Sequence, residues 1–532
     1  TLQGKDSIVL LPTGGGKTIA FQLASFLLPG ITLVIDPLIA LINDQVANLL
    51  DYGIDRAVGI TSQLDQDDRL VAHESFAKGH YIFCYVAPER LQMKDFRSAI
   101  RSVTVFAPIN IIVIDEAHCV SEWGHDFRVS YLNIARNSRN YCMKSGIVPP
   151  ILGLTGTASR SVLRDVRREL EILEFDSVIT PKNFDRSELI FTILECRSNE
   201  KYERLLGVLF SLPQKFNKSP NNFFLPLGDQ SNTGLIFFPH VNGEFGIRNG
   251  FERIRERFGD YIGLYSGKNP RGIPEESWQE IKMIFADEFK NNEITILTCT
   301  NAFGMGIDKP NVRYTVHMNL PRSIEAFYQE AGRAGRDRKR AECTLILSND
   351  YPNRTKSLLD PSKPLEEISK TTENISYGDS DDITRALFFH VNTFRGAKEE
   401  YREVQNLIDL IGDLKEEKTL RIPYNGTYRT KTEKAVHRLV IIGVIRDYTI
   451  DYSSSEIEII ISGNNSEENL QSYLNYLRNY DRKFAEQAER VAFQYLHISH
   501  KDFILLLAEK LINEFIYNII ELSRRRSLNE ML

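Results

Sequence analysis

A glycine-rich segment near the start of the chain has the composition of a phosphate-binding loop. Residues 12–18 read Pro-Thr-Gly-Gly-Gly-Lys-Thr and follow the apolar run 7–11. Glycines let backbone N–H groups approach a phosphate without Cβ clashes, and a following helix N-terminus adds partial positive charge. Lys17 would contact the β- and γ-phosphates of ATP, and Thr18 would bind Mg²⁺. The expected nucleotide-binding residues of this loop are Thr13, Gly14, Gly15, Gly16, Lys17 and Thr18.

Two adjacent carboxylates end a second apolar run. Residues 111–118 read Ile-Ile-Val-Ile-Asp-Glu-Ala-His. Asp115 would hold Mg²⁺, and Glu116 would orient and polarise an attacking water. His118 completes the motif and is also a candidate catalytic residue. An Asp-Glu pair alone is common on protein surfaces, but after a buried strand and downstream of a phosphate loop it indicates ATP hydrolysis.

A third motif combines arginines with glycines. Residues 329–337 read Gln-Glu-Ala-Gly-Arg-Ala-Gly-Arg-Asp. If the segment is helical, Arg333 and Arg336 share one face. Arginines that meet the developing charge on a γ-phosphate raise the rate by roughly 10³–10⁵. We therefore expect Gln329, Arg333 and Arg336 to be catalytic and the ATP site to be divided between two domains, so that hydrolysis opens and closes a cleft as in a motor.

The elements that must position these residues follow a strand–helix alternation. Continuous Val/Ile/Leu runs predict strands that are buried on both faces of a parallel sheet, and a helix is expected between them, for example at 39–50. The same alternation of strands and helices begins again near Gly234. The predicted fold class is therefore α/β, with two doubly wound domains. The expected strands are 7–11, 31–35, 81–86, 111–114 and 151–155, then 235–238, 261–265, 294–299, 314–318 and 343–347.

The rest of the chain has a different pattern. We expect an exposed insertion at 213–234, and a mainly helical C-terminal region. A helix at 432–442 that ends at Gly443, followed by a hairpin over 444–461, is typical of a winged helix. The basic residues 524–526 are interpreted as a solvated helix end. The predicted division is a first domain at 1–185, a second domain at 186–350, a linker at 351–385, a winged helix at 386–465 and a helical region at 466–532. Within the winged-helix segment, a helix is expected at 386–414.

Composition limits the class of protein. With 42% hydrophobic and 26% charged residues among 532, the chain is neither globally disordered nor a small disulfide scaffold. No apolar run reaches the ~18 residues of a membrane span, so we expect a cytoplasmic protein without a membrane partner. The six Cys include no C-x-x-C pair, and zinc is not expected. Because the net charge is −6, nucleic acid would require a local basic groove.

Together these motifs resemble the RecQ family of superfamily 2 helicases. Residues 119–128, which directly follow Asp115–His118, read Cys-Val-Ser-Glu-Trp-Gly-His-Asp-Phe-Arg. They are similar to the family's aromatic-rich loop, which couples binding of single-stranded DNA to ATP hydrolysis. Trp123 and Phe127 could stack on bases, and Arg128 could meet phosphate or a base face. His125 is counted with them as a candidate DNA contact.

Further segments resemble motifs Ia, Ib, III and V of the family. They are residues 36–46, 86–91, 154–158 and 300–310, and 319–321 lead into the arginine motif as in that family. The resemblance implies DNA contacts at Pro37, Arg90, Thr300 and Lys309. It also assigns Asp308 to the nucleotide site.

The resemblance covers about residues 1–350 and implies two RecA-like domains that bind ATP and Mg²⁺. It implies a DNA helicase that moves 3′ to 5′ on single-stranded DNA and acts on tailed duplexes, in repair, recombination or phage defence, with possible protein partners. In a bacterium such a protein would be associated with the nucleoid. A translocase that does not unwind, an RNA helicase and an inactive nucleic-acid-binding scaffold stay open as alternatives.

Overall fold

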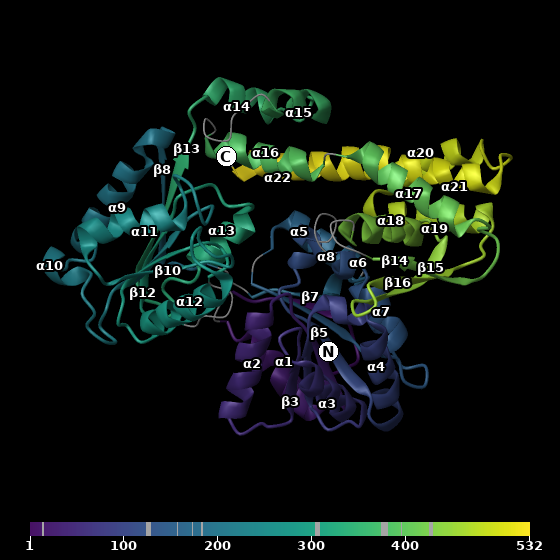
Figure 1. Cartoon of the computed structure of the whole chain (residues 1–532), viewed down its shortest axis with the longest axis horizontal. Helices are drawn as coiled ribbons and strands as arrows, with labels where there is room; N and C mark the ends of the chain where they lie inside the picture. The colour runs from purple at the N-terminus through teal and green to yellow at the C-terminus, as the bar shows by residue number, and fades with distance from the viewer. Residues whose placement is uncertain are drawn as a thin grey trace. The chain divides into compact units, whose positions relative to one another are not determined.

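The computed structural model describes residues 1–12, 15–123, 129–156, 158–172, 174–181, 185–303, 309–373, 381–394, 396–424 and 429–531. These residues form two compact units, whose elements are labelled in Figure 1. Unit 1 combines residues 1–11, 16–181 and 394–524. Unit 2 combines residues 12–15, 182–393 and 525–532.

Unit 1 contains a seven-stranded parallel sheet in the order β3-β4-β2-β5-β6-β1-β7. Alternate side chains of one strand enter separate apolar clusters: Ile112 and Ile114 join one, Ile111 and Val113 the other. Burial on both faces explains the continuous apolar runs. The strands are β1 Ser7–Leu10, β2 Ile31–Ile35, β3 Ala57–Ile60, β4 Phe83–Val86, β5 Ile109–Ile114, β6 Ile151–Thr155 and β7 Val178–Ile179.

Helices connect these strands and cover the sheet (Figure 1). They are α1 Lys17–Leu27, α2 Ile39–Asp51, α3 Gln66–Ala77, α4 Lys94–Phe106, α5 Cys119–Trp123, α6 Val129–Leu132, α7 Ile134–Tyr141 and α8 Arg160–Glu169, with 3₁₀ turns at Pro88–Gln92 and Phe175–Ser177. The five strands predicted for this domain are confirmed to within two residues at each end.

Unit 2 contains a six-stranded parallel sheet in the order β10-β11-β9-β12-β13-β8. Its strands are β8 Leu189–Cys196, β9 Thr233–Phe237, β10 Ile262–Tyr265, β11 Ile296–Cys299, β12 Val312–His317 and β13 Ala341–Ser348. Its helices are α9 Lys201–Lys215, α10 Pro220–Phe223, α11 Ile247–Phe258, α12 Glu275–Lys290, α13 Ile324–Ala331, α14 Pro352–Leu358, α15 Leu365–Glu373 and α16 Asp382–Thr393, with a 3₁₀ turn at Ser198–Glu200. The prediction of two parallel-sheet domains is confirmed.

Two segments of unit 2 differ from the sequence prediction. The expected exposed insertion at 213–234 contains the end of α9, helix α10 and the start of β9, and Phe223 within it is fully buried. The expected linker at 351–385 contains α14 and α15, and Leu358 and Ile368 pack in an apolar cluster with Leu387. Polar composition suggested loops, whereas a few apolar residues at helical spacing are enough to anchor short helices.

The C-terminal region of unit 1 has a three-stranded antiparallel sheet in the order β14-β16-β15. The strands are β14 Thr419–Pro423, β15 Ile445–Asp451 and β16 Glu456–Ile461. The helices are α17 Ala397–Ile411, α18 Arg429–Ile441, α19 Ser466–Tyr480, α20 Arg482–Phe493 and α21 His500–Glu509, with a π-helical segment at Lys510–Ile520. Helix α22 Glu521–Met531 follows, and its residues from Arg525 onward are assigned to unit 2. The predicted hairpin is present, and Gly443 with φ 81° follows α18 as expected.

Two details of the C-terminal region correct the sequence prediction. The single helix expected over 386–414 is divided into α16 and α17, because Gly396 has φ 101°, outside the range of a right-handed helix. The trio 524–526 is not a solvated helix end, since α22 continues through it and Arg525 is 2% exposed. The Arg525 guanidinium donates to the carbonyl oxygen of Lys363 at 2.7 Å.

Within the residues given by the structure, no helix is both long and apolar enough to cross a membrane.

Candidate active site

Three segments that contain or adjoin candidate functional residues meet at one edge of the sheet in unit 1. Lys17 begins the helix after β1, Asp115 and Glu116 follow β5, and Thr155 ends β6. The strand order places β5, β6 and β1 side by side and parallel, so their carboxyl ends share an edge. In doubly wound folds this edge is where ligands bind.

Lys17 lies against both predicted catalytic carboxylates. Its Nζ is 2.8 Å from Glu116 Oε1 and 3.8 Å from Asp115 Oδ1. Burial alone would lower the pKa of Lys17, but the charges of Glu116 and Asp115 outweigh it and raise that pKa above its ordinary value. Lys17 is therefore held as an ammonium group, which is the state that binds phosphate.

A third carboxylate, Asp36, lies at the end of β2 and adds negative charge to the site. Burial, and then the charge of Asp115, raise the pKa of Asp36 well above its ordinary value. Its Oδ1 accepts a hydrogen bond from Leu38 N at 3.0 Å, whereas its buried Oδ2 has no hydrogen-bond partner among the described residues. Burial raises the pKa of Asp115 too, and the charge of Lys17 opposes that shift. Such clustered oxygen ligands fit a hard divalent cation.

Glu116 is held in an unusual backbone conformation. Its φ is 45°, in the left-handed region that non-glycine residues rarely adopt. Hydrogen bonds on both sides hold it there: Asp115 N donates to Ile35 O at 2.9 Å, and Ala117 N donates to Leu154 O at 2.8 Å. Strained residues cluster at functional sites, where the surrounding structure offsets a cost of about 1–3 kcal/mol. The local strain thus accompanies a carboxylate that contacts Lys17.

His118 links the carboxylates to strand β6. Its Nδ1 is 3.0 Å from Thr155 Oγ1 and 3.3 Å from Glu116 Oε2, and the residue is 3% exposed. These contacts place His118 where it can orient Glu116 rather than reach solvent. Thr155 was not among the predicted site residues, although its position in the segment that resembles motif III was a signal for it.

The phosphate-loop residues are described only in part. Gly16 has φ 85° and directly precedes helix α1, which Lys17 begins. Thr18 Oγ1 accepts a hydrogen bond from Gln45 Nε2 of α2 at 3.1 Å. Gly15 N donates to Pro12 O at 2.8 Å. Thr13 and Gly14 lie outside the described residues.

The arginine motif belongs to unit 2. Gln329 lies in α13, but this helix ends at Ala331, so Arg333 and Arg336 follow it in turns and the expectation of one helical face is wrong. The C-cap of α13 is Gly332, and beyond it Gly335 has φ 64° and its N–H donates to Val312 O at 3.0 Å. Arg333 is 6% exposed and Arg336 is half-buried.

Several predicted DNA contacts are buried. Arg90 Nη2 donates to Thr61 O at 2.9 Å, and Lys309 Nζ donates to Asn292 Oδ1 at 2.5 Å. Burial lowers the pKa of Lys309 to about 8. Pro37 and Thr300 are buried as well. These positions favour structural roles for Arg90 and Lys309, and their contacts with DNA stay predictions.

The side chains of the remaining candidate site residues are not among those that the structure describes. Asp308, His125, Phe127 and Arg128 lie outside the described residues. Trp123 ends helix α5, but its side chain is not described.

The sequence model of the DEAD/DEAH box helicase family matches residues 1–166, and that of the helicase conserved C-terminal domain matches residues 276–338. The probable ATP-dependent DNA helicase RecS of Bacillus subtilis (strain 168) is 32% identical over 69% of this chain and 66% of its own length. The ATP-dependent DNA helicase RecQ of the same organism is 28% identical over 86% of this chain and 74% of its own length. The chain belongs to the family of RecQ-like helicases.

Other relatives of this RecQ-like chain are longer. RecQ of Pasteurella multocida (strain Pm70) is 33% identical over 69% of the chain but only 52% of its own length. The chain thus spans from about half to three quarters of these relatives. Among solved structures, the DEAD-box helicase Mss116 bound to ssRNA has a TM-score of 0.51 at 19% identity and covers 81% of this chain and 88% of its own. At this identity, the likeness shows a shared fold alone.

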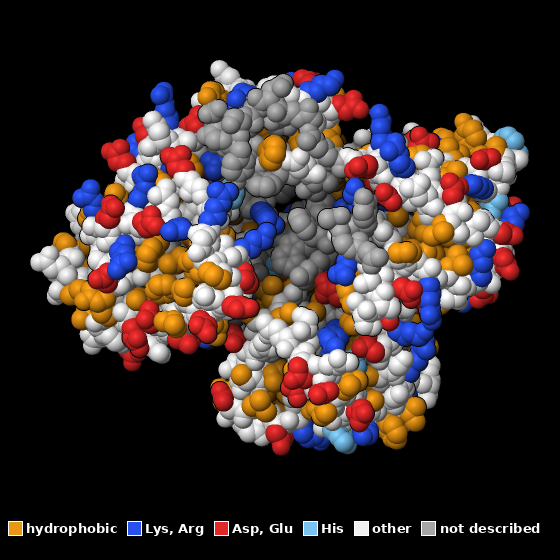
Figure 2. Space-filling view, viewed as in Figure 1, with side chains coloured by type: hydrophobic (Ala, Val, Ile, Leu, Met, Phe, Trp, Pro, Cys, Tyr) orange, Lys and Arg blue, Asp and Glu red, His pale blue; other side chains and the backbone are white. Residues whose placement is uncertain are grey.

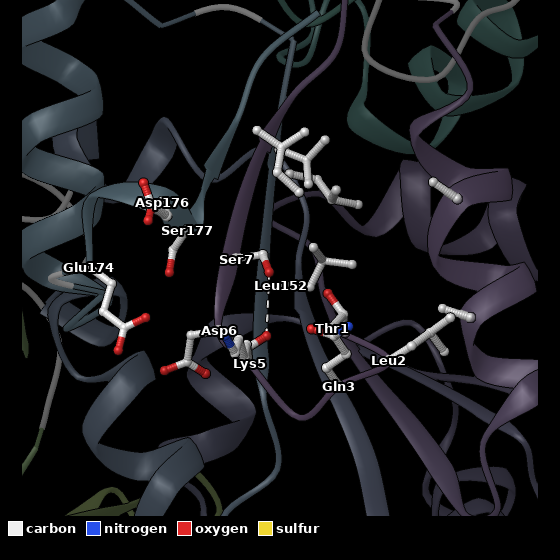
Figure 3. A pocket seen from close by; sticks show the side chains of 15 residues that line it. Thr1, Leu2, Gln3, Lys5, Asp6, Ser7, Leu152, Glu174, Asp176 and Ser177 are labelled. Atoms are coloured by element: carbon white, nitrogen blue, oxygen red, sulfur yellow. Dashed lines mark hydrogen bonds between the residues drawn. The ribbon is translucent and has the colours of Figure 1, made fainter.

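The RecQ-like chain also has a cavity of about 560 Å³ in unit 1. Helix α1 contributes Ala20 and Ala24, and strand β6 contributes Leu152 and Leu154. Figure 3 shows Glu174 and Asp176 on one side and Thr1 on the other. None of the predicted site residues lines it.

Charge on the described surface of the RecQ-like chain is mixed. Figure 2 shows acidic and basic side chains interspersed over the described residues of the visible face. This distribution agrees with the net charge of −6. Any attraction for nucleic acid must come from local groups rather than from the charge of the whole protein.

Proposed function

We propose that this RecQ-like chain is an ATP-dependent DNA helicase that moves 3′ to 5′ on single-stranded DNA and unwinds tailed duplexes. The observation that carries the proposal is the cluster of Lys17, Asp115 and Glu116, with His118 behind Glu116, at one sheet edge. The names of the RecS and RecQ relatives, ATP-dependent DNA helicases, supply the substrate class.

In the proposed reaction, Lys17 exchanges its carboxylate partners for the β- and γ-phosphates of ATP. Glu116, released from that ion pair, orients the attacking water and accepts its proton. His118 keeps the Glu116 carboxylate aimed at the site through its contact with Thr155. Lys17 and Glu116 therefore pair with each other when ATP is absent, and each contacts a reactant when ATP is bound.

The carboxylate of Asp115 and the hydroxyl of Thr18 would hold Mg²⁺, and Asp36 would contribute negative charge beside it. When bound, Mg²⁺ neutralises phosphate charge. Oxygen ligands from a buried carboxylate and a hydroxyl suit this hard cation. Asp308 would join the nucleotide site, as the family resemblance implies.

Unit 2 would supply Gln329, Arg333 and Arg336 to the same reaction. A guanidinium with a planar fork of donors matches the charge that develops on a transferring phosphoryl group. Under this proposal, ATP brings elements of both units into one site, and its hydrolysis releases them. That cycle would drive movement along DNA.

Contact with DNA is proposed for the segment that follows Glu116. Trp123 and Phe127 would stack on bases, with His125 and Arg128 beside them, as in the family's aromatic-rich loop. Further backbone contacts are proposed at Pro37, Arg90, Thr300 and Lys309. The β15–β16 hairpin and helix α18 would form a winged helix within residues 386–465, which would contact duplex DNA.

The cellular setting is also a proposal. The protein would work in the cytoplasm, on the nucleoid if its source is bacterial, in DNA repair, recombination or phage defence, together with protein partners. The names of the relatives, ATP-dependent DNA helicases, support the part of this proposal that concerns work on DNA.

The decisive experiment measures steady-state ATP hydrolysis without nucleic acid, with single-stranded DNA and with RNA. Lys17→Ala serves as the blank, because it removes the phosphate-binding ammonium and should abolish turnover. Lys78→Ala, which changes an exposed lysine, is the matched control and should hydrolyse ATP normally. Near-normal hydrolysis by Lys17→Ala would refute the assignment of the phosphate loop.

The same series separates the alternatives. Stimulation by DNA above RNA supports the proposal, and the reverse supports an RNA helicase. Displacement of a strand from a 3′-tailed but not a 5′-tailed duplex supports unwinding in the proposed direction. Stimulated hydrolysis without displacement supports a translocase. No hydrolysis supports a scaffold, although Lys17, Glu116, Arg333 and Arg336 are all present.

A further inference from the structure

The segment that resembles the aromatic-rich loop is anchored on both sides. We call residues 119–133 the coupling segment. It begins directly after His118, contains helices α5 and α6, and ends at Asn133. Residues 124–128 within it are not described. Its first part contacts helix α8, which binds α19 of the C-terminal region. Its last part contacts strand β15 of the same region.

The first part of the coupling segment is tied to helix α8. Ser121 Oγ donates to Asp165 Oδ2 at 2.9 Å. The other oxygen of Asp165 accepts from Arg168 Nη2 at 2.6 Å. Arg168 therefore fixes the position of Asp165, and Asp165 in turn binds Ser121.

Arg168 is in turn held by a tyrosine of the C-terminal region. Its guanidinium carbon is 3.3 Å from the ring centroid of Tyr480, at the end of α19. The Tyr480 hydroxyl donates to Glu169 Oε1, and Arg168 Nε lies 3.4 Å from the same oxygen. Tyr480 is packed edge-on against Phe515, with the ring centroids 5.0 Å apart. Tyr480 thus connects the aromatic packing around Phe515 to Arg168, and Arg168 connects it through Asp165 to the coupling segment.

Arg524 makes a second contact with the first part. Its Nη2 donates to the carbonyl oxygen of Ser121 at 3.4 Å. The same guanidinium lies 5.6 Å from the ring centroid of Phe394. Ser121 is therefore held through its side chain and its backbone.

The last part of the coupling segment is tied to strand β15. Asn133 Nδ2 donates to the Tyr448 hydroxyl at 3.1 Å and to Val129 O at the same distance. Tyr448 is fully buried. Its neighbour Asp447 pairs with Arg97 of α4 at 3.0 Å, which fixes β15 to the α/β domain.

We propose that the C-terminal region clamps both ends of the coupling segment through Tyr480 and Tyr448, and so sets how strongly DNA stimulates ATP hydrolysis. The inference rests on the proposed function. Helix α5 begins at Cys119, next to His118, and His118 contacts Glu116. The contacts of Ser121 and Asn133 hold the described parts of the segment in place relative to His118. The two tyrosines are positioning residues, since neither touches the nucleotide site.

The test uses the full chain with Tyr480→Phe, Tyr448→Phe and the double variant. Each change removes one hydroxyl and keeps the ring, so the packing survives. Tyr495→Phe, at a tyrosine of the same region that is 41% exposed, is the matched control. Two quantities are measured: deuterium uptake by peptides that span 119–133, and ATP hydrolysis with and without saturating single-stranded DNA.

The proposal predicts that uptake by these peptides rises about 3- to 10-fold in each single variant, as loss of one hydrogen bond allows. The ratio of DNA-stimulated to basal hydrolysis should fall by about threefold or more, with basal hydrolysis unchanged. The double variant should be worse than either single variant, because the two tyrosines hold different parts of the segment through separate contacts. Tyr495→Phe should match the original protein in both measurements.

The two readouts separate failure of the inference from failure of the proposed function. Unchanged uptake across 119–133 in folded variants overturns the clamp, whatever the hydrolysis rates are. Uptake that rises while the stimulation ratio stays constant also overturns it, because the clamp would then be structural only. If the unmodified chain is not stimulated by DNA at all, the proposed function fails, and the link from the clamp to hydrolysis fails with it.

Discussion

At the scale of single residues, Glu116 shows how the surroundings define a candidate catalytic group. Its backbone has φ 45°, its Oε1 contacts Lys17, and its Oε2 lies 3.3 Å from His118 Nδ1. The adjacent Asp115 lies 3.8 Å from Lys17. Two carboxylates therefore share one ammonium partner but differ in their other contacts, which fits different roles for them in ATP hydrolysis.

Replacing Glu116 with Gln should slow hydrolysis without loss of nucleotide binding. The amide keeps the size of the side chain but accepts no proton from water, so turnover should fall by about 10²–10⁴-fold. Steady-state hydrolysis and binding of a fluorescent nucleotide measure the two effects. Glu74→Gln, on the exposed side of α3, is the control. Turnover within tenfold of the original protein would contradict the assigned role.

At the scale of elements, helix α18 carries a carboxyl group that is poorly solvated. Burial, and then the charge of Glu89, raise the pKa of Glu433 to about 7, although a hydrogen bond from the Tyr424 hydroxyl at 3.2 Å opposes the shift. Glu89 belongs to the first α/β domain, and Tyr424 follows β14. Glu433 is thus a titratable group among elements that are distant in the sequence.

The stability of unit 1 should respond to this group. Since the pKa of Glu433 is higher in the folded protein, its contribution to stability is complete below the unfolded pKa of 4.5 and is lost as pH rises through about 7. Glu433→Gln should therefore be more stable than the original protein at pH 8, by about 1–3 kcal/mol, and the gain should shrink toward pH 5.

Chemical denaturation at pH 5 and pH 8 measures this difference. Glu416→Gln, at an exposed position of the same region, is the control and should show no such dependence on pH. An equal effect of Glu433→Gln at both pH values would show that the carboxyl group does not titrate in this range.

At the scale of the whole molecule, a buried ion pair connects elements of unit 2 that are far apart in the sequence. In unit 2, Lys201 Nζ lies 2.6 Å from Asp382 Oδ2, and neither side chain is more than 1% exposed. The same carboxylate oxygen accepts a hydrogen bond from Ser348 N at 2.9 Å. One pair thus connects the start of α9, the end of β13 and the start of α16.

Removing one partner of this buried pair should destabilise unit 2. Asp382→Ala leaves an uncompensated ammonium in the interior, which costs about 3–5 kcal/mol. The double variant Lys201→Met with Asp382→Leu should lose much less. Unfolding by denaturant measures both, with Glu252→Ala from an exposed pair as the control. A double variant as unstable as Asp382→Ala would argue against the charge as the cause.

The two units should also cooperate in hydrolysis. If Arg333 acts on ATP as proposed, Arg333→Ala should lower turnover by about 10³-fold or more while nucleotide binding is kept. Arg333→Lys keeps the charge without the planar fork and should restore little activity. Arg338→Ala, at an exposed arginine nearby, is the control. Normal turnover in Arg333→Ala would remove unit 2 from the reaction.

Much of the fold could be predicted from local sequence. Strands β2 and β6 have the predicted bounds, because a fully buried strand reads as an unbroken apolar run. Strand β8 was missed because it is an edge strand with several exposed residues, among them Ile193. Helices α14 and α15 were missed because they are short and mostly polar, and packing on a neighbouring cluster stabilises them.

The sequence by itself determined the phosphate loop, the carboxylate pair and the arginine motif, because each is a run of adjacent residues whose chemistry depends on local spacing. Only the tertiary structure decided that Thr155 and Asp36 join the site, and that Arg333 and Arg336 leave the helix. It alone brought Tyr480 to Arg168 and Tyr448 to Asn133. Contacts between residues so far apart in the chain depend on how separate elements pack, and no local pattern records that packing.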